Sequence, residues 1–289
     1  MADPIRQLIG EELRGLRKES GVPVKRAIRA IRRSRASLDR IENGLAPLKP
    51  DTIRTLGQLY RADADTIDHL VALAATTDTL RSGWWDTLGG PPSASFGAYL
   101  SAEQRATQID MWAPLMVPGL LQTEEYALRV TPGRDDEEIR RRVAIRLRRQ
   151  TNLLGRDIPV RIRVVLGEAA VRQVIGGAEI MRDQMAHLLH MSRRPNVQVR
   201  ILPFTAGSHP GLDGGPIVVL RGHSTGIVYL ETHSTAAYLV DPKGVERHLG
   251  LLDELSNRSF SVIRSRAQIA AVAWPAHDLR GSANGASVN

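Results

Sequence analysis

The sequence predicts a multidomain protein in which an all-α domain of five short helices is followed by an α+β domain. Two observations predict the helices and the break after them: residues 5–79 repeat apolar positions at helical spacing, and 81–94 are rich in Gly and Pro. Beyond residue 114, helical patterns mix with short β-branched runs typical of strands. The expected boundaries are a helical domain at 1–80, a linker at 81–94, an α+β domain at 95–273 and a disordered tail at 274–289.

The amino-acid composition limits the compartments and partners that we expect for this protein. Apolar residues make up 42% of the 289 residues, charged residues 24%, and there is no cysteine, which fits a reducing compartment. No apolar run approaches the roughly 18 residues of a membrane helix, and the N-terminus lacks the apolar core of a secretory signal. A formal net charge of +8 favours polyanionic partners. We therefore expect a cytoplasmic, nucleoid-associated protein that does not bind membranes.

The helices of the first domain are delimited by apolar periodicity and by Gly or Pro breaks. Gly21 and Pro23 end the first helix, and Asn43-Gly44 ends the third. The predicted helices are 5–19, 24–33, 34–44, 51–60 and 64–75.

The second domain is predicted to mix both element types. Helices are expected over 94–112, 123–130, 137–154, 179–191 and 244–273, and strands over 160–166, 197–202, 217–221, 227–231 and 237–240. Pro118-Gly119 reads as a turn into a helix with Thr123 as its N-cap.

Residues 14–44 are strongly basic, with ten Lys or Arg against three acids. In a helix-turn-helix the second helix needs a small, polar start to approach base edges, and a buried seam to fix the angle between helices. Ser34 and its neighbours supply such a start, with Ser34 as a plausible N-cap. The seam would contain Ala27, Ile31, Leu38 and Ile41. The alternative is a helical bundle whose basic face is only solvated.

The series LRGLRKESG, SRASLDRIENG and PDTIRTLGQLY resembles the helix-turn-helix domain of phage-repressor (434 Cro/repressor-like) and xenobiotic-response-element (XRE) regulators, over about residues 5–75. The resemblance implies a structural ion pair between Arg17 and Glu42. It also implies DNA contacts, with Arg35, Ala36 and Arg40 at bases and Ser34, Ser37 and Asn43 near the backbone. We expect Lys25, Arg26 and Arg29 to replace the phosphate contact that a Gln makes in the family. Val24 and Arg32 stand where the family usually has Gln and Gly.

The runs VPGLLQTEEYA, IRLRRQTNLL, VVLGEAAVR and NVQVRILPFTAGSHPG, in this order, resemble a second known domain. They look like the domain of unknown function that follows the helix-turn-helix in many actinobacterial regulators, the WhiJ-type proteins among them, over about residues 95–272. The resemblance implies a small BldB-like partner protein.

Candidate site residues in the second domain are fewer. Glu168 and Glu231 follow predicted strands, and His209 lies in a loop rich in Gly and Pro, so all three are candidate ligand-binding residues. No metal, cofactor or catalytic motif is recognisable, and we expect a non-enzyme without cofactor or metal. A basic run between residues 140 and 149 either binds an acidic partner or is solvated.

The sequence thus favours a sequence-specific DNA-binding transcriptional regulator, whose second domain senses a small-molecule ligand or a partner protein. Because one such domain reads few base pairs, we expect a homodimer on double-stranded DNA. Two alternatives stay open: an enzyme or toxin-like effector with an autoregulatory helix-turn-helix, and an adaptor for which DNA contact is secondary.

Overall fold

The computed structural model describes residues 4–64, 66–68, 70–71, 74, 84–90, 94–222, 226–231, 236–239 and 242–274. The described residues fall into two compact units. The first contains those within 1–106, 220–229 and 234–245, and the second those within 107–219, 230–233 and 246–289. The predicted domain boundaries stay a prediction.

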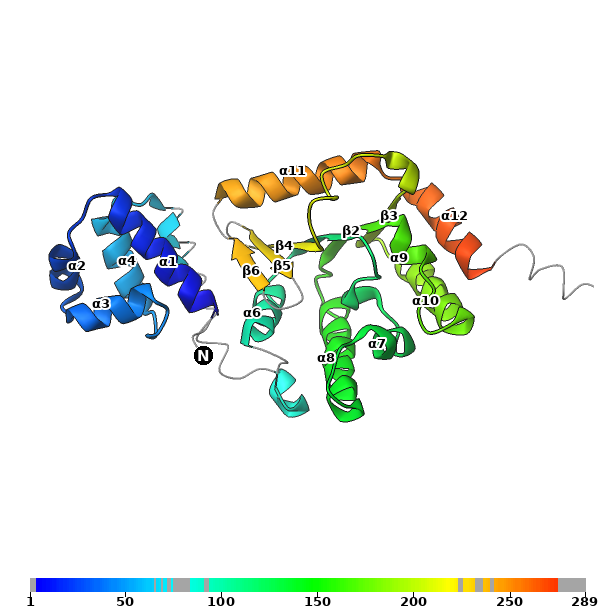
Figure 1. The fold of residues 1–289 in the computed structure, drawn as a ribbon, viewed down its shortest axis with the longest axis horizontal. Coiled ribbons are helices and arrows are strands. Elements are labelled where there is room, and N and C mark those ends of the chain that lie inside the picture. Colours follow the sequence, from blue (N-terminus) through cyan, green and yellow to red (C-terminus); the bar gives the residue numbers. More distant parts are fainter. Residues whose placement is uncertain are drawn as a thin grey trace, which may run out of the picture. The chain divides into compact units, whose positions relative to one another are not determined.

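Four helices at the N-terminus form a bundle (Figure 1), as the sequence predicts. They are α1 (Pro4–Glu19), α2 (Val24–Ile31), α3 (Arg35–Glu42) and α4 (Pro50–Leu59). The described residues of the predicted fifth helix, over 64–75, are helical too. The bundle core contains Leu13, Ala27, Leu38, Ile53 and Leu56, all fully buried. Of the predicted seam between α2 and α3, Ala27, Leu38 and Ile41 are buried and Ile31 is half-buried.

Helix α1 crosses α3 at a glycine. A Cβ atom on Gly10 would lie 2.5 Å from the carbonyl oxygen of Ile41, so only glycine allows the two backbones to approach this closely. This close crossing brings the arginines of α1 within reach of Glu42, the last residue of α3.

Six strands form a mixed sheet in the order β3-β2-β1-β4-β5-β6. The strands are β1 (Gln108–Ala113), β2 (Arg161–Gly167), β3 (Val197–Leu202), β4 (Ile217–Arg221), β5 (Ile227–Glu231) and β6 (Ala236–Leu239). β1, β2 and β3 are parallel, with Met111 opposite Val164 and Val164 opposite Val199. The second part is thus a single sheet flanked by helices, which is the α+β class that the sequence predicts.

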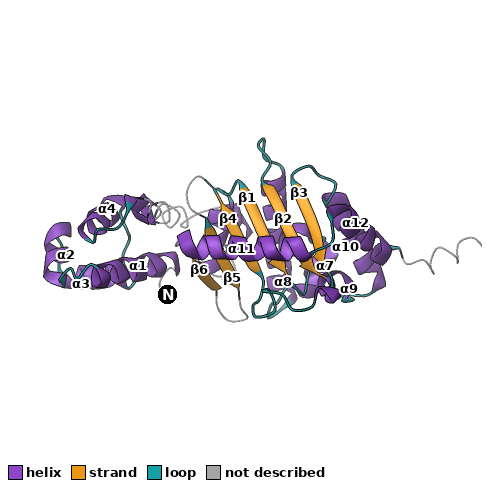
Figure 2. Ribbon diagram, turned by 90° about the horizontal axis from the view of Figure 1, so that it is seen from above, coloured by secondary structure: helices purple, strands orange, loops and turns teal. Residues whose placement is uncertain are grey.

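Helices cover the parallel strands on both faces. α11 (Pro242–Arg258) crosses one face and α8 (Asp136–Leu154) lies on the other (Figures 1 and 2). α10 (Ala178–Met191) packs on α12 (Val262–Ala273), which also contacts β3. The remaining helices are α6 (Ala94–Glu103), α7 (Glu124–Val130), α9 (Glu168–Arg172) and the 3-10 turns η1 (Trp84–Leu88), η2 (Gly119–Leu121) and η3 (Phe204–Ala206).

The prediction of one helix over 94–112 is wrong. α6 ends at Glu103, and residues 108–113 form β1 in the interior of the sheet. Five of the six β1 residues are buried, so the strand lacks the alternation of apolar and polar residues that marks a half-exposed strand. Short apolar runs of this kind look the same in a buried helix and a buried strand.

Three further differences are smaller. The helical region predicted over 244–273 is two helices, because the chain breaks before Ser261, which caps α12 through its hydroxyl. Helix α9 has no counterpart in the predicted elements. Part of the predicted linker forms η1 and buries Trp85, whereas residues 275–289 of the predicted tail lie outside the described residues. No helix in the described part of the chain has the length and apolarity needed to cross a membrane.

Candidate nucleic-acid interface

The turn between α2 and α3 is tight and is made by a left-handed arginine. Arg32 has φ 51° and ψ 46°, the conformation that glycine adopts most cheaply. Two residues later Ser34 begins α3, where its Oγ accepts a hydrogen bond from the backbone N–H of Ser37 at 3.2 Å. The predicted N-cap is present, and the position that the resemblance assigns to glycine does need a positive φ.

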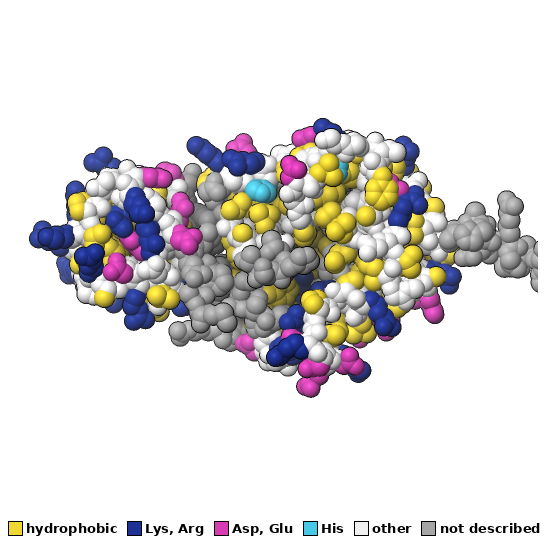
Figure 3. Space-filling view, viewed as in Figure 1, with side chains coloured by type: hydrophobic (Ala, Val, Ile, Leu, Met, Phe, Trp, Pro, Cys, Tyr) yellow, Lys and Arg dark blue, Asp and Glu magenta, His cyan; other side chains and the backbone are white. Residues whose placement is uncertain are grey.

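The sequence-predicted DNA-binding residues lie on the outer side of this unit. All are exposed except Ser37, which is half-buried; the exposed ones are Lys25, Arg26, Arg29, Ser34, Arg35, Ala36, Arg40 and Asn43. On the face drawn in Figure 3, Lys and Arg side chains gather over α1–α4. The opposite sides of α2 and α3 bury Ala27, Leu38 and Ile41. Each helix therefore has one packed and one basic, open side.

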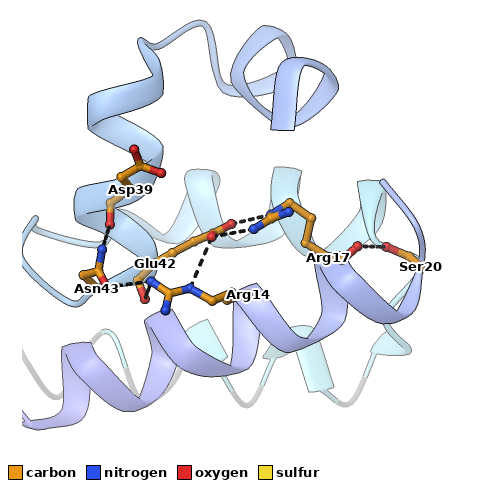
Figure 4. A network of polar contacts seen from close by, with 6 residues as sticks. All are labelled: Arg14, Arg17, Ser20, Asp39, Glu42 and Asn43. Atoms are coloured by element: carbon orange, nitrogen blue, oxygen red, sulfur yellow. Dashed lines mark hydrogen bonds and ion pairs between the residues drawn. The ribbon is translucent and has the colours of Figure 1, made fainter. Parts of the chain in front are cut away.

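A buried carboxylate locks α3 to α1 (Figure 4). Glu42 is only 3% exposed, and Arg17 donates to both of its oxygens, from Nε at 2.6 Å and from Nη2 at 2.8 Å. The hydrogen bond to Glu42 raises the pKa of Arg17 above its usual value. The Arg17–Glu42 pair that the resemblance implies is therefore present, in the two-pronged geometry that fixes both partners.

Arg14 extends this lock, although the sequence reasoning did not single it out. Its Nη2 donates to the carbonyl oxygen of Glu42 at 3.0 Å and to Oδ1 of Asn43 at 2.6 Å. A signal existed, since Arg14 precedes Arg17 by three residues and so shares its helix face. Asn43 also donates from Nδ2 to the carbonyl oxygen of Asp39 at 2.7 Å. Its amide thus fixes the end of α3, and a DNA contact by Asn43 stays a prediction.

The three candidate ligand residues have separate surroundings. Burial alone would raise the pKa of Glu168, but the N–H of Phe204 (2.8 Å) and the side chain of Arg172 (2.5 Å) donate to it and lower that pKa overall. His209 packs edge-on against Trp112, and its Nδ1 accepts from the N–H of Gly211. Glu231 ends β5 and is exposed. No hydrogen bond or ion pair joins these three described residues, and no cluster of three metal-ligand side chains occurs in the described part of the chain.

Comparisons with known protein families also divide the chain into two parts. Residues 96–271 match the model of a domain of unknown function, DUF5753. The chain belongs to the DUF5753 family. In this family member, residues 8–70 also match the model of a helix-turn-helix domain, which suggests a DNA-binding regulator. No curated protein and no solved structure matches the chain.

Proposed function

We propose that this protein is a sequence-specific DNA-binding transcriptional regulator. The observation that carries the proposal is the outer side of α2 and α3, where exposed Lys and Arg side chains flank the polar, capped start of α3. The start of a recognition helix approaches base edges in the major groove, and its free N–H groups favour phosphate. The Arg17–Glu42 lock holds α3 at a fixed angle, as this geometry requires.

Two kinds of contact are assigned. Arg35, near the start of α3, donates to a base edge, together with contacts from Ala36 and Arg40. Arg26 on α2 neutralises a phosphate, as do Lys25 and Arg29. Base contacts confer sequence preference, whereas phosphate contacts strengthen binding to every sequence and make it sensitive to salt.

The test compares two single substitutions on DNA selected from a random pool. Arg35→Ala should weaken binding by about 1–3 kcal/mol and relax the preference at one base position. Arg26→Ala should weaken binding to all sequences alike and reduce the salt slope by about 1. Fluorescence anisotropy over a salt series measures both effects. Arg148→Ala, which removes an exposed arginine from α8, serves as the charge-matched control. Unchanged affinity in both variants would show that α2 and α3 do not form the interface.

Further parts of the proposal concern the rest of the chain. We propose an XRE-type, actinobacterial regulator of the WhiJ kind that acts in the cytoplasm at the nucleoid as a homodimer. Its second domain senses a small ligand or a BldB-like partner protein, and the protein acts by binding and not as an enzyme. The motifs SRASLDRIENG and VPGLLQTEEYA support this assignment. Pull-down of the full chain, with mass measurement in solution, tests the partner and the dimer.

A further inference from the structure

Four large apolar side chains are exposed in the second unit, where the parallel strands end. They are Leu115 (61% exposed), Met116 (46%), Phe204 (65%) and Leu212 (63%). Leu115 and Met116 follow the carboxyl end of β1, Phe204 follows that of β3, and Leu212 lies in the loop between β3 and β4. Because β1, β2 and β3 are parallel, their carboxyl ends share one edge of the sheet. We call these four residues the apolar edge.

The turns that follow β1 and β3 both rest on the end of β2. A Cβ atom on Gly167, the last residue of β2, would clash with the carbonyl oxygen of Pro114, so the turn before Leu115 lies directly on β2. The N–H of Phe204 donates to Oε2 of Glu168, the next residue along from β2, at 2.8 Å. These contacts bring Leu115 and Phe204 to the same place, although 89 positions separate them in the sequence.

The loop that carries Leu212 is fastened to this edge as well. A Cβ atom on Gly211 would lie 2.8 Å from Nε1 of Trp112, so the loop backbone lies against an indole of β1. Nη1 of Arg258 on α11 donates to the carbonyl oxygen of Ser208 at 2.7 Å. Leu212 therefore projects from a loop that is held in place on the same edge as the turns after β1 and β3.

The charged groups beside the apolar edge neutralise each other. Glu168 pairs with Arg172 at 2.5 Å, and Arg258 pairs with Glu254 at 2.7 Å. The whole chain carries a formal net charge of +8, so two copies repel each other on average. This repulsion is weak where each positive group already has a negative partner. On the face of the second unit drawn in Figure 3, hydrophobic side chains gather between the charged ones.

The area of the apolar edge fits a contact between two protein chains. Each of its side chains exposes on the order of 100 Å², which gives roughly 400 Å² of apolar surface for the four together. A standard interface buries about 800 Å² on each partner, and its centre is apolar and poor in charged residues. The apolar edge supplies about half of that area. The polar groups around it can supply the rim.

We propose that two copies of this chain form a dimer through the apolar edge. A twofold dimer brings the same patch of both copies together, so the patch must complement itself. Apolar groups without excess charge meet that condition, whereas an excess of arginine does not. The inference rests on the proposed function, because a regulator that reads two half-sites needs two copies. All four residues belong to the second unit, so the contact does not use α2 or α3.

Sedimentation equilibrium of the full chain without DNA measures the dimer. Wild type should be dimeric at micromolar concentration. Phe204→Glu and Leu212→Glu should each raise the dissociation constant at least about tenfold, because like charges would meet across the twofold axis. Ile158→Glu is the matched control: Ile158 is 84% exposed but precedes β2, at the opposite edge of the sheet. It should change the constant by less than about twofold.

Cross-linking gives a second measurement that does not depend on introducing a charge. The chain contains no cysteine, so a single introduced cysteine is the only site for a thiol reagent. With a short bis-maleimide, Leu212→Cys should form a covalent dimer and Ile158→Cys should form little. This comparison decides the question if either glutamate variant folds poorly by circular dichroism.

Each other outcome contradicts the inference in a different way. A monomeric wild type would leave the apolar edge to another occupant and would overturn both the inference and the proposed homodimer. A dimer that Phe204→Glu and Leu212→Glu affect no more than Ile158→Glu would overturn the inference and leave the homodimer standing. Failure of wild type to bind DNA in the salt titration would count against the proposed function, while a dimer measured without DNA would remain.

Discussion

Arginine-rich helices occur in both parts of the chain, but their charges are treated in opposite ways. In the N-terminal bundle Arg14 and Arg17 of α1 turn toward the buried carboxylate of Glu42, which Arg17 binds in a two-pronged ion pair, whereas the arginines of α2 and α3 face outward. In α8 three arginines turn inward: Arg142 pairs with Glu138 of the same helix, Arg146 donates to the amide oxygen of Gln122, and Arg149 is buried. A basic helix is therefore not by itself a DNA-binding surface.

This difference in how the arginines are paired indicates which of them remain available to bind a partner. In the Arg17–Glu42 pair both oxygens of the carboxylate are bound by Arg17, so the contribution of the pair is to hold α3 against α1. The outward arginines keep their charge available for a polyanion. The inward arginines of α8 hold structure instead, since Arg142 pairs with Glu138 and Arg146 fastens Gln122. The net charge of +8 describes both regions equally and distinguishes neither.

The largest expected effect on the free energy of unfolding comes from breaking the Arg17–Glu42 ion pair. Arg17→Ala leaves the Glu42 carboxylate buried, and removing one partner of a buried pair costs about 3 kcal/mol. Arg14, whose Nε lies 3.4 Å from Glu42, compensates for part of this loss. Urea unfolding of the full chain, followed by circular dichroism at 222 nm for the helical bundle, measures the change.

The matched control is Arg54→Ala. Arg54 pairs with Asp68 at 2.8 Å, but both side chains are exposed, so the substitution should cost less than about 1 kcal/mol. If Arg17→Ala were no more destabilising than Arg54→Ala, the Arg17–Glu42 pair would not hold the bundle together.

Much of the bundle could be predicted from the sequence because its signals are local. Gly21, Pro23 and Gly44 end helices, Ser34 starts one, and the apolar spacing is helical throughout. The Arg17–Glu42 pair was predicted from the resemblance to the helix-turn-helix family, since no local rule links residues that are 25 positions apart.

The second part was harder to predict for physical reasons. β1 is buried almost throughout, so its sequence lacks the alternation that distinguishes a strand from a helix. Arg146 and Arg148 flank Leu147 in the sequence and look alike there. Which of them turns inward depends on the segment around Gln122, which lies 24 residues away and docks onto one side of α8. Only the tertiary structure contains that information.

A smaller effect is expected where an outward arginine sits in an unfavourable backbone conformation. Arg32→Gly should raise the free energy of unfolding by about 0.5–1 kcal/mol, because glycine adopts a positive φ without the steric penalty of a Cβ atom. Arg33→Gly removes the same charge at a position outside the left-handed region and should instead destabilise by about 0.5–1 kcal/mol. Both variants lose one arginine, so the difference between their urea midpoints measures the energetic cost of the positive φ at residue 32. A loss of stability in Arg32→Gly would show that its side chain contributes more than its backbone costs.

The smallest effect concerns Glu138, the carboxylate that pairs with Arg142 on α8. The backbone N–H of Arg134, and then the side chains of Arg134 and Arg142, lower the pKa of Glu138 from 4.5 to about 2. A carboxyl group whose pKa is lower in the folded state stabilises the fold fully above the unfolded value of 4.5, and this contribution is lost as the pH falls toward 2.

Glu138→Gln should therefore lower the melting temperature at neutral pH and show a shallower loss of stability than wild type over that acidic interval. Thermal melts of both proteins over a pH series measure this response. Parallel pH curves for wild type and Glu138→Gln would mean that this carboxylate does not stabilise α8.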